Sequence, residues 1–139
     1  MTPQCFLDTN VLVYAAAGKR TEARKYAVAS HIVGGGRFQI SAQVLGEFYG
    51  IVRKQQHEML PIFEAQEWMR RLQAFCAAEI DAALVHSAMF IRERFKISFW
   101  DAALVAASER LSLPLLYSED LSHGQKYGTV TVINPFKHG

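Results

Sequence analysis

The 139-residue sequence has few cysteines, no long apolar run and little excess charge. Its two cysteines, Cys5 and Cys76, are too few for a disulfide framework, and no zinc-ligand spacing surrounds them. The apolar run at residues 102–107 is far too short to span a membrane. A strand pattern begins within the first residues, so we expect no signal peptide. These absences predict a cytoplasmic protein without a membrane partner.

The small excess of positive charge permits a nucleic-acid partner but does not require one. The net charge is +2 and the sequence pI is about 8.6, whereas nucleic-acid footprints are concentrated basic patches. Arg92, Arg94 and Lys96 lie near the end of one predicted helix, where the helix dipole favours cations. A contact with phosphate is the alternative interpretation. The length predicts a single domain over residues 1–139.

Strand and helix patterns alternate along the chain. Short apolar runs predict strands, and apolar residues at helical spacing predict the helices between them. Such alternation is typical of an α/β fold with a parallel sheet and helices on both faces. The predicted strands are residues 5–7, 37–40, 79–81, 113–117 and 129–133; the predicted helix caps are Asn10, Thr21, Ser41 and Ser98, and Pro61 opens a further helix.

One glycine run invites a functional interpretation. Gly34, Gly35 and Gly36 could suggest a phosphate-binding loop, but such a loop needs Lys and then Ser or Thr after its last glycine. Here residues 37–40 follow and form a predicted strand. We therefore interpret the run as the end of a helix.

Four acids each lie where a predicted strand gives way to a helix or loop. The carboxyl ends of parallel strands share one edge of a sheet, where ligands bind, so distant acids can meet there. Gathered carboxylates repel one another unless a metal ion joins them, and oxygen ligands suit Mg²⁺ or Mn²⁺. This pattern indicates metal-assisted attack of water on a phosphodiester. The four acids are Asp8, Glu47, Asp101 and Asp120.

The first two acids also have ordinary structural interpretations. Asp8 could cap a helix, although Asn10 could serve that purpose and an acid directly after an apolar strand is harder to explain structurally. Glu47 lies in the second turn of a predicted helix, where acids are usually solvated.

The other two acids also have alternatives. Asp101 is the third residue after Ser98, which fits a capping pattern, but an acid in a first helical turn can still face a metal. Asp120 follows Glu119 and could belong to a solvated turn, although its strand-end position favours the shared edge.

Together these segments resemble the PIN-domain ribonucleases, particularly the VapC-like toxins of bacterial toxin–antitoxin pairs. The resemblance covers nearly the whole chain. The family often has Thr where Ser118 stands, and serine keeps the hydroxyl. The segments that carry it are residues 7–12, 41–47, 98–102 and 116–125, and residues 133–136 resemble the usual ending.

The resemblance implies a PIN-like three-layer α/β/α sandwich around a short parallel sheet. It implies that the four acids bind metal and catalyse, and that Asn10 and Ser118 orient carboxylates or water. The expected activity is that of a Mg²⁺- or Mn²⁺-dependent endoribonuclease that hydrolyses RNA and serves as the toxin of a toxin–antitoxin pair. Either Glu47 or Asp120 could accept a proton from the attacking water.

Three other functions remain open from the sequence. A housekeeping PIN nuclease would share the same acids. A phosphatase of the haloacid-dehalogenase type also uses an acid at a strand end, but it normally has a second Asp where this chain has Asn10. A non-catalytic binding module could keep the acids and act through a partner.

Two neighbouring predicted helices, residues 42–54 and 61–76, are unusually rich in large apolar side chains. These wrap more than one stripe of each helix, so part of them should form an exposed interaction surface. The alternative is that the pair simply packs on itself. By resemblance we expect a homodimer inhibited by a small antitoxin protein. The apolar residues are Phe48, Tyr49, Ile51, Ile62, Phe63, Trp68, Met69, Leu72 and Phe75.

Overall fold

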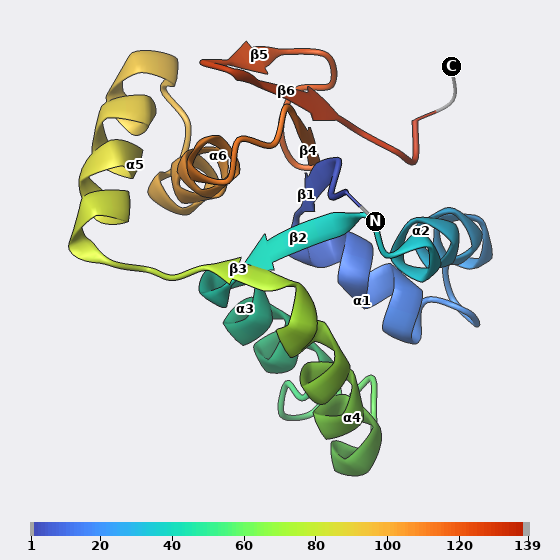
Figure 1. The fold of residues 1–139 in the computed structure, drawn as a ribbon. Helices are drawn as coiled ribbons and strands as arrows, with labels where there is room; N and C mark the ends of the chain where they lie inside the picture. Colours follow the sequence, from blue (N-terminus) through green and yellow to red (C-terminus); the bar gives the residue numbers. More distant parts are fainter. Residues whose placement is uncertain (1, 138–139) are drawn as a thin grey trace.

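A six-stranded sheet lies at the centre of the protein, which a computed structural model describes for residues 2–137 (Figure 1). The strand order is β3-β2-β1-β4-β6-β5, and all neighbours are parallel except β5 and β6. The order reverses between β1 and β4, and ligands bind at such points in open sheets. The strands are β1 (Cys5–Leu7), β2 (Phe38–Ser41), β3 (Cys76–Ala78), β4 (Leu115–Tyr117), β5 (Lys126–Tyr127) and β6 (Val130–Ile133).

Helices cover the sheet from both sides, as the predicted sandwich requires. Each of the first three strands is followed by two helices before the chain returns to the sheet. Figure 1 shows α5 and α6 on one side and α1, α2 and α3 on the other, with α4 packed on α3. None of the helices in the described chain is both long and apolar enough to cross a bilayer. The helices are α1 (Thr9–Ala17), α2 (Ala23–Gly35), α3 (Ala42–Val52), α4 (Ile62–Leu72), the single-turn η1 (Gln73–Phe75), α5 (Ala82–Phe95) and α6 (Phe99–Arg110).

The core lies between the central strands and their helices. Phe6 and Leu7 in β1 are fully buried, and burial of each side chain stabilises the fold by about 1.5–3 kcal/mol. Helix α6 is buried from Ala102 to Ser108, as its apolar sequence predicts. Its small residues let its backbone approach β4 and β6 closely. The rigid core therefore fixes both the end of β1 and the start of α6.

Local signals predicted several helix ends correctly. The Ser41 hydroxyl accepts the Val44 N–H at 3.4 Å, and the Ser98 hydroxyl accepts the Asp101 N–H at 3.2 Å. Gly36 ends α2 in the left-handed region with φ 68°, which confirms that the glycine run terminates a helix.

Other local predictions were wrong. Asp8, not Asn10, caps α1, and Glu22, not Thr21, precedes α2. The third strand is β3 rather than residues 79–81, because its pairing with β2 outweighs weak strand propensity in Cys76–Ala78. The two-residue strand β5 was missed altogether.

Helices α3 and α4 pack partly on the core, so fewer of their large apolar side chains are exposed than the sequence suggests. Phe48 is fully buried, and Trp68 is half-buried with its ring centroid 6.1 Å from that of Phe48. Ile62 and Phe63, by contrast, are 53% and 78% exposed. A groove of about 780 Å³ lies between these helices and β3, and its lining includes Tyr49.

Candidate functional site

The four acids singled out in the sequence come together at one edge of the sheet. Asp8 directly follows β1, and Asp120 lies in the loop after β4. Glu47 is carried by α3 after β2, and Asp101 lies in the first turn of α6. All four line a single cavity of about 150 Å³. Their metal-binding and catalytic roles stay predictions.

Asp8 is the most enclosed of these acids, with 5% of its surface exposed. Its backbone is anchored in the sheet, because the Asp8 N–H donates to the Tyr117 carbonyl at 2.9 Å. One carboxylate oxygen caps α1 by accepting the Thr9 N–H at 2.6 Å, and the other accepts the Ser118 hydroxyl at 2.7 Å. The parallel register of β1 and β4 thus holds Asp8 and Ser118 together across the strand-order reversal.

The electrostatics of the cavity disfavour ionised acids. Burial raises the pKa of Asp8 from 3.8 to about 6, against the opposing effect of its two hydrogen bonds. The charges of Asp120 and Asp101 raise that pKa further. The pKa of Asp120 is also raised, first by partial burial and then by the charge of Asp101. A divalent cation would reverse this penalty by compensating the carboxylate charges.

Two of the acids are turned toward neutral donors. The Thr9 hydroxyl donates to Glu47 Oε1 at 2.9 Å, and the Asn10 amide donates to Asp120 Oδ2 at 3.1 Å. Asn10 and Ser118 therefore contact acids of the cavity, and their orienting role stays a prediction. With the side chains so turned, no three His, Cys, Asp or Glu residues within residues 2–137 form a group that could hold a metal ion.

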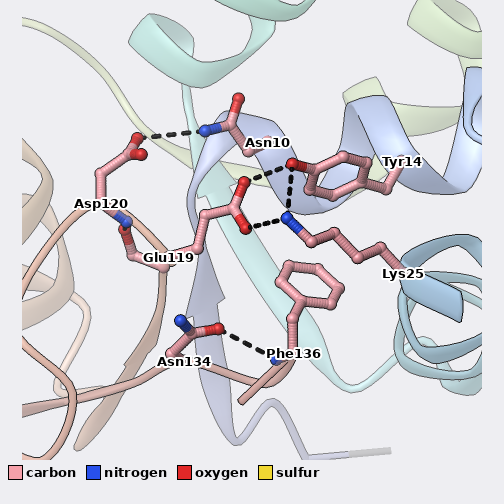
Figure 2. A network of polar contacts seen from close by, with 8 residues as sticks. Asn10, Tyr14, Lys25, Glu119, Asp120, Asn134 and Phe136 are labelled. Atoms are coloured by element: carbon pink, nitrogen blue, oxygen red, sulfur yellow. Dashed lines mark hydrogen bonds and ion pairs between the residues drawn. The ribbon is translucent and has the colours of Figure 1, made fainter. Parts of the chain in front are cut away.

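A second polar network lies beside the cavity, around Glu119 (Figure 2). The Lys25 ammonium donates to Glu119 Oε2 at 2.9 Å, and the Tyr14 hydroxyl donates to Glu119 Oε1. The Lys25 Nζ atom lies 5.0 Å from the Tyr14 ring centroid and 5.8 Å from that of Phe136. This network ties α1, α2 and the C-terminal segment to the loop that carries Asp120.

Sequence reasoning missed several residues at this site. Gln43 is buried in α3, and its amide donates to the Trp100 carbonyl oxygen at 3.1 Å. Trp100 lines the acid cavity and is 50% exposed. The only available signal was position: Gln43 and Trp100 lie inside the segments that carry Glu47 and Asp101, and Thr9 follows Asp8 directly.

Comparison with known proteins places this geometry in context. The family profile described as PIN domain matches residues 5–127. No curated protein matches the chain significantly. The solved structures that resemble it include a toxin–antitoxin complex from Klebsiella pneumoniae, which is 19% identical and has a TM-score of 0.69. That match covers 95% of this chain and 98% of the other.

Two further structures show the same fold. VapC20 of Mycobacterium tuberculosis, a toxin that cleaves the sarcin–ricin loop, is 20% identical, with a TM-score of 0.65 over 83% of this chain and 88% of that one. VapBC2 of Rickettsia felis, bound to a DNA fragment from its promoter, is 16% identical, with a TM-score of 0.62 over 92% of this chain and 96% of that one. At these identities the likeness is one of fold.

Proposed function

Because this chain belongs to the PIN domain family, we propose that it is a Mg²⁺- or Mn²⁺-dependent endoribonuclease that hydrolyses RNA phosphodiesters in the cytoplasm. The observation that carries the proposal is the cavity at the strand-order reversal. Acids from four separate segments line it, and the pKa of its most buried acid is raised to about 6. Such an arrangement is costly to a protein unless the acids serve a ligand.

The donor set fits a hard divalent cation in kind. Asp8, Glu47, Asp101 and Asp120 supply only carboxylate oxygens, the ligands that Mg²⁺ and Mn²⁺ prefer. Glu47 and Asp120 are exposed, and each carboxylate accepts one hydrogen bond from a neutral side chain. Turning either side chain toward a cation costs about one such bond, roughly 0.5–1.5 kcal/mol. Compensation of the carboxylate charges by the cation favours this rotation of the side chain.

In the proposed reaction, the oxygen of a water molecule attacks phosphorus and the bond from phosphorus to one ribose oxygen breaks. A bound divalent cation would neutralise charge on the phosphate and activate the water. Glu47 or Asp120 accepts the proton that the water loses, and solvent protonates the leaving ribose oxygen. Asp8 keeps its position through Ser118 and the Thr9 N–H, and Asn10 orients Asp120 before the cation binds.

Metal dependence is the sharpest test of this proposal. Cleavage of total RNA by the purified protein should stop in excess chelator and return with Mg²⁺ or Mn²⁺. The cation should also raise the melting temperature, because at 100 times its dissociation constant a ligand stabilises the native state by about 2.7 kcal/mol. The variant Asp8→Asn should also lose cleavage. Its matched control is Glu22→Gln, which changes an exposed acid that makes no capping hydrogen bond. Cleavage that persists in chelator would overturn the mechanism.

We also propose that the protein is a toxin inhibited by a small antitoxin, and that it forms a homodimer. The similar structures that are toxins or toxin–antitoxin complexes support the toxin and the antitoxin partner. The apolar groove between α3 and α4 could receive an amphipathic antitoxin helix. Ala77 in β3 is exposed and lines the groove, so it is a better probe of this surface than the half-buried Trp68, whose replacement would disturb packing on Phe48.

Expression in a bacterium tests the biological setting. The wild type should arrest growth with RNA cleavage, and Asp8→Asn should not. Harmless expression without RNA cleavage would favour a housekeeping nuclease or a binding module. Light scattering should show a dimer at tens of micromolar, roughly the range of weak association. A monomer there would exclude the dimer, and unchanged antitoxin affinity in Ala77→Glu would exclude the groove.

A phosphatase that forms an aspartyl-phosphate is the less supported alternative. Asn10 occupies the position where that chemistry needs a second acid, and its amide is already bonded to Asp120. Transfer of radioactive phosphate to Asp8 would favour the phosphatase.

A further inference from the structure

The acid cavity has no positive charge of its own with which to hold RNA. None of the ten residues that line it is Lys, Arg or His, and four of the ten are acids. Phosphate contacts usually supply most of the affinity for a nucleic acid, through lysine and arginine. A metal ion compensates charge at one phosphate only. The cavity therefore offers a bound nucleotide no cationic side chain of its own, and a contact with the base is one that does not depend on charge.

Trp100 is the only aromatic residue that lines the cavity, and it directly precedes Asp101. It is 50% exposed, although nothing about the second position of a helix requires a large apolar ring there. The ring of Phe99 meets it edge-on, with centroids 4.9 Å apart at an interplanar angle of 85°. The buried Gln43 amide holds the Trp100 carbonyl oxygen at 3.1 Å. Both contacts pre-organise an exposed indole at the mouth of the cavity.

The volume of the cavity decides where a nucleotide can fit. At about 150 Å³ it holds on the order of five water molecules. A hydrated cation and a phosphate group would fill that space. A nucleobase must therefore stay outside, at the rim, where the indole is exposed.

We propose that Trp100 is a stacking platform for an unpaired base next to the cleaved phosphate. The inference rests on the proposed nuclease function and specifies which side chain contacts the base. An indole face accepts any base that is free of its own stack, whereas bases inside a duplex are not available to it. Paired regions would be cut slowly, and loops would be cut fast.

Fluorescence can report this contact directly. The chain has two tryptophans, so Trp68→Phe leaves Trp100 as the only one, and adding Asp8→Asn prevents cleavage under the proposed function. A ten-nucleotide oligo(A) should quench the remaining emission in the presence of Mg²⁺. A ten-nucleotide abasic strand, which keeps the phosphates and loses the bases, should not quench it. A ten-base-pair RNA duplex should not quench it either.

Cleavage kinetics of the otherwise unchanged protein supply the second measurement. Trp100→Ala should raise KM for a single-stranded oligonucleotide roughly 5- to 150-fold, the range for loss of one base–aromatic stack, with a smaller change in kcat. Trp100→Phe should recover most of the loss. Phe90→Ala, which removes an aromatic ring that is 69% exposed on α5, is the matched control and should leave KM unchanged.

The outcomes separate this inference from the proposed function. If the wild type cuts RNA but Trp100→Ala has the KM of the wild type and oligo(A) causes no quenching, the stacking site is wrong and the nuclease stands. Base-dependent quenching without cleavage by the wild type would support the stacking site and overturn the nuclease. Emission that changes on dilution of the protein, and not with RNA, would show that a second copy of the chain covers Trp100 and would overturn the inference.

Discussion

Glu119 and Asp120 are neighbours in the chain, but their carboxylates lie in opposite electrostatic settings. Glu119 is paired with Lys25 at 2.9 Å and accepts the Tyr14 hydroxyl, and both partners of the pair are partly shielded from water. Asp120 receives only the neutral Asn10 amide, and it lines a cavity with three other acids. Figure 2 shows the two carboxylates directed to different partners.

The contrast shows where this fold leaves charge uncompensated. The Lys25–Glu119 pair joins helix α2 to the loop after β4, so its charges are balanced within the protein. The acid cavity contains no such partner among its lining residues. An uncompensated cluster beside a compensated one supports the external cation that the proposed mechanism requires.

The largest expected effect comes from replacing acids that line the cavity. Asp8→Asn and Asp101→Asn should each lower cleavage by more than about a hundredfold, since loss of a metal ligand should exceed the 10- to 100-fold cost of losing an outer partner. Glu119→Gln, which leaves the four acids in place, should cost less than about tenfold. Rates on one RNA, with enzymes matched for melting temperature, measure the difference. Equal losses of cleavage rate in all three variants would show that the acid cavity and the Lys25–Glu119 pair do not differ in their importance for cleavage.

A smaller effect concerns the stability of the metal-free protein. The pKa of Asp8 is about 6 in the folded chain against an ordinary 3.8, so the folded state binds this proton more tightly than the unfolded state does. The contribution of Asp8 to stability is therefore lost as pH rises from about 4 to about 6, by roughly 3 kcal/mol.

The variant Asp8→Asn has no titrating carboxyl at this position, so it tests the predicted dependence of stability on pH. In chelator, the variant should be more stable than the wild type above pH 6, and the difference should shrink toward pH 4. Denaturant midpoints at each pH provide the comparison. A stability difference that does not vary with pH would show that Asp8 does not titrate in this window.

The smallest effect concerns the paired setting. Lys25→Met should destabilise the protein by about 0.5–1 kcal/mol, because a partly exposed ion pair contributes little in water. A double-mutant cycle with Glu119→Gln isolates the interaction of the two side chains. Lys19→Met, at an exposed lysine after α1, controls for loss of one positive charge. A coupling energy of zero would mean that the pair does not restrain the loop that carries Asp120.

Features that depend on short stretches of chain could be predicted from the sequence. The caps at Ser41 and Ser98 follow from a hydroxyl three residues before a free backbone N–H, and the end of α2 follows from its glycines. The placement of the four acids after predicted strands is also local. The resemblance to the PIN-domain ribonucleases implied the PIN-like sandwich, and the family match confirms it.

Local propensity failed where a long-range contact outweighed it. Residues 79–81 carry an apolar signal, yet the strand forms at Cys76–Ala78, because β2 supplies its hydrogen-bonding partner there. Asp8 displaced Asn10 as the cap because α1 already begins at Thr9, directly after the extended Asp8, whose N–H is bound by the Tyr117 carbonyl of β4.

The sequence by itself determined the alternation of strands and helices and the position of an acid beyond several strand ends, because hydrophobic period and capping chemistry act over a few residues. The tertiary structure alone decided which distant side chains meet. Lys25 reaches Glu119 across 94 positions, and Gln43 reaches Trp100 across 57. Such pairs leave no periodic signal, since sheet order and helix packing, rather than spacing in the chain, bring them within hydrogen-bonding distance.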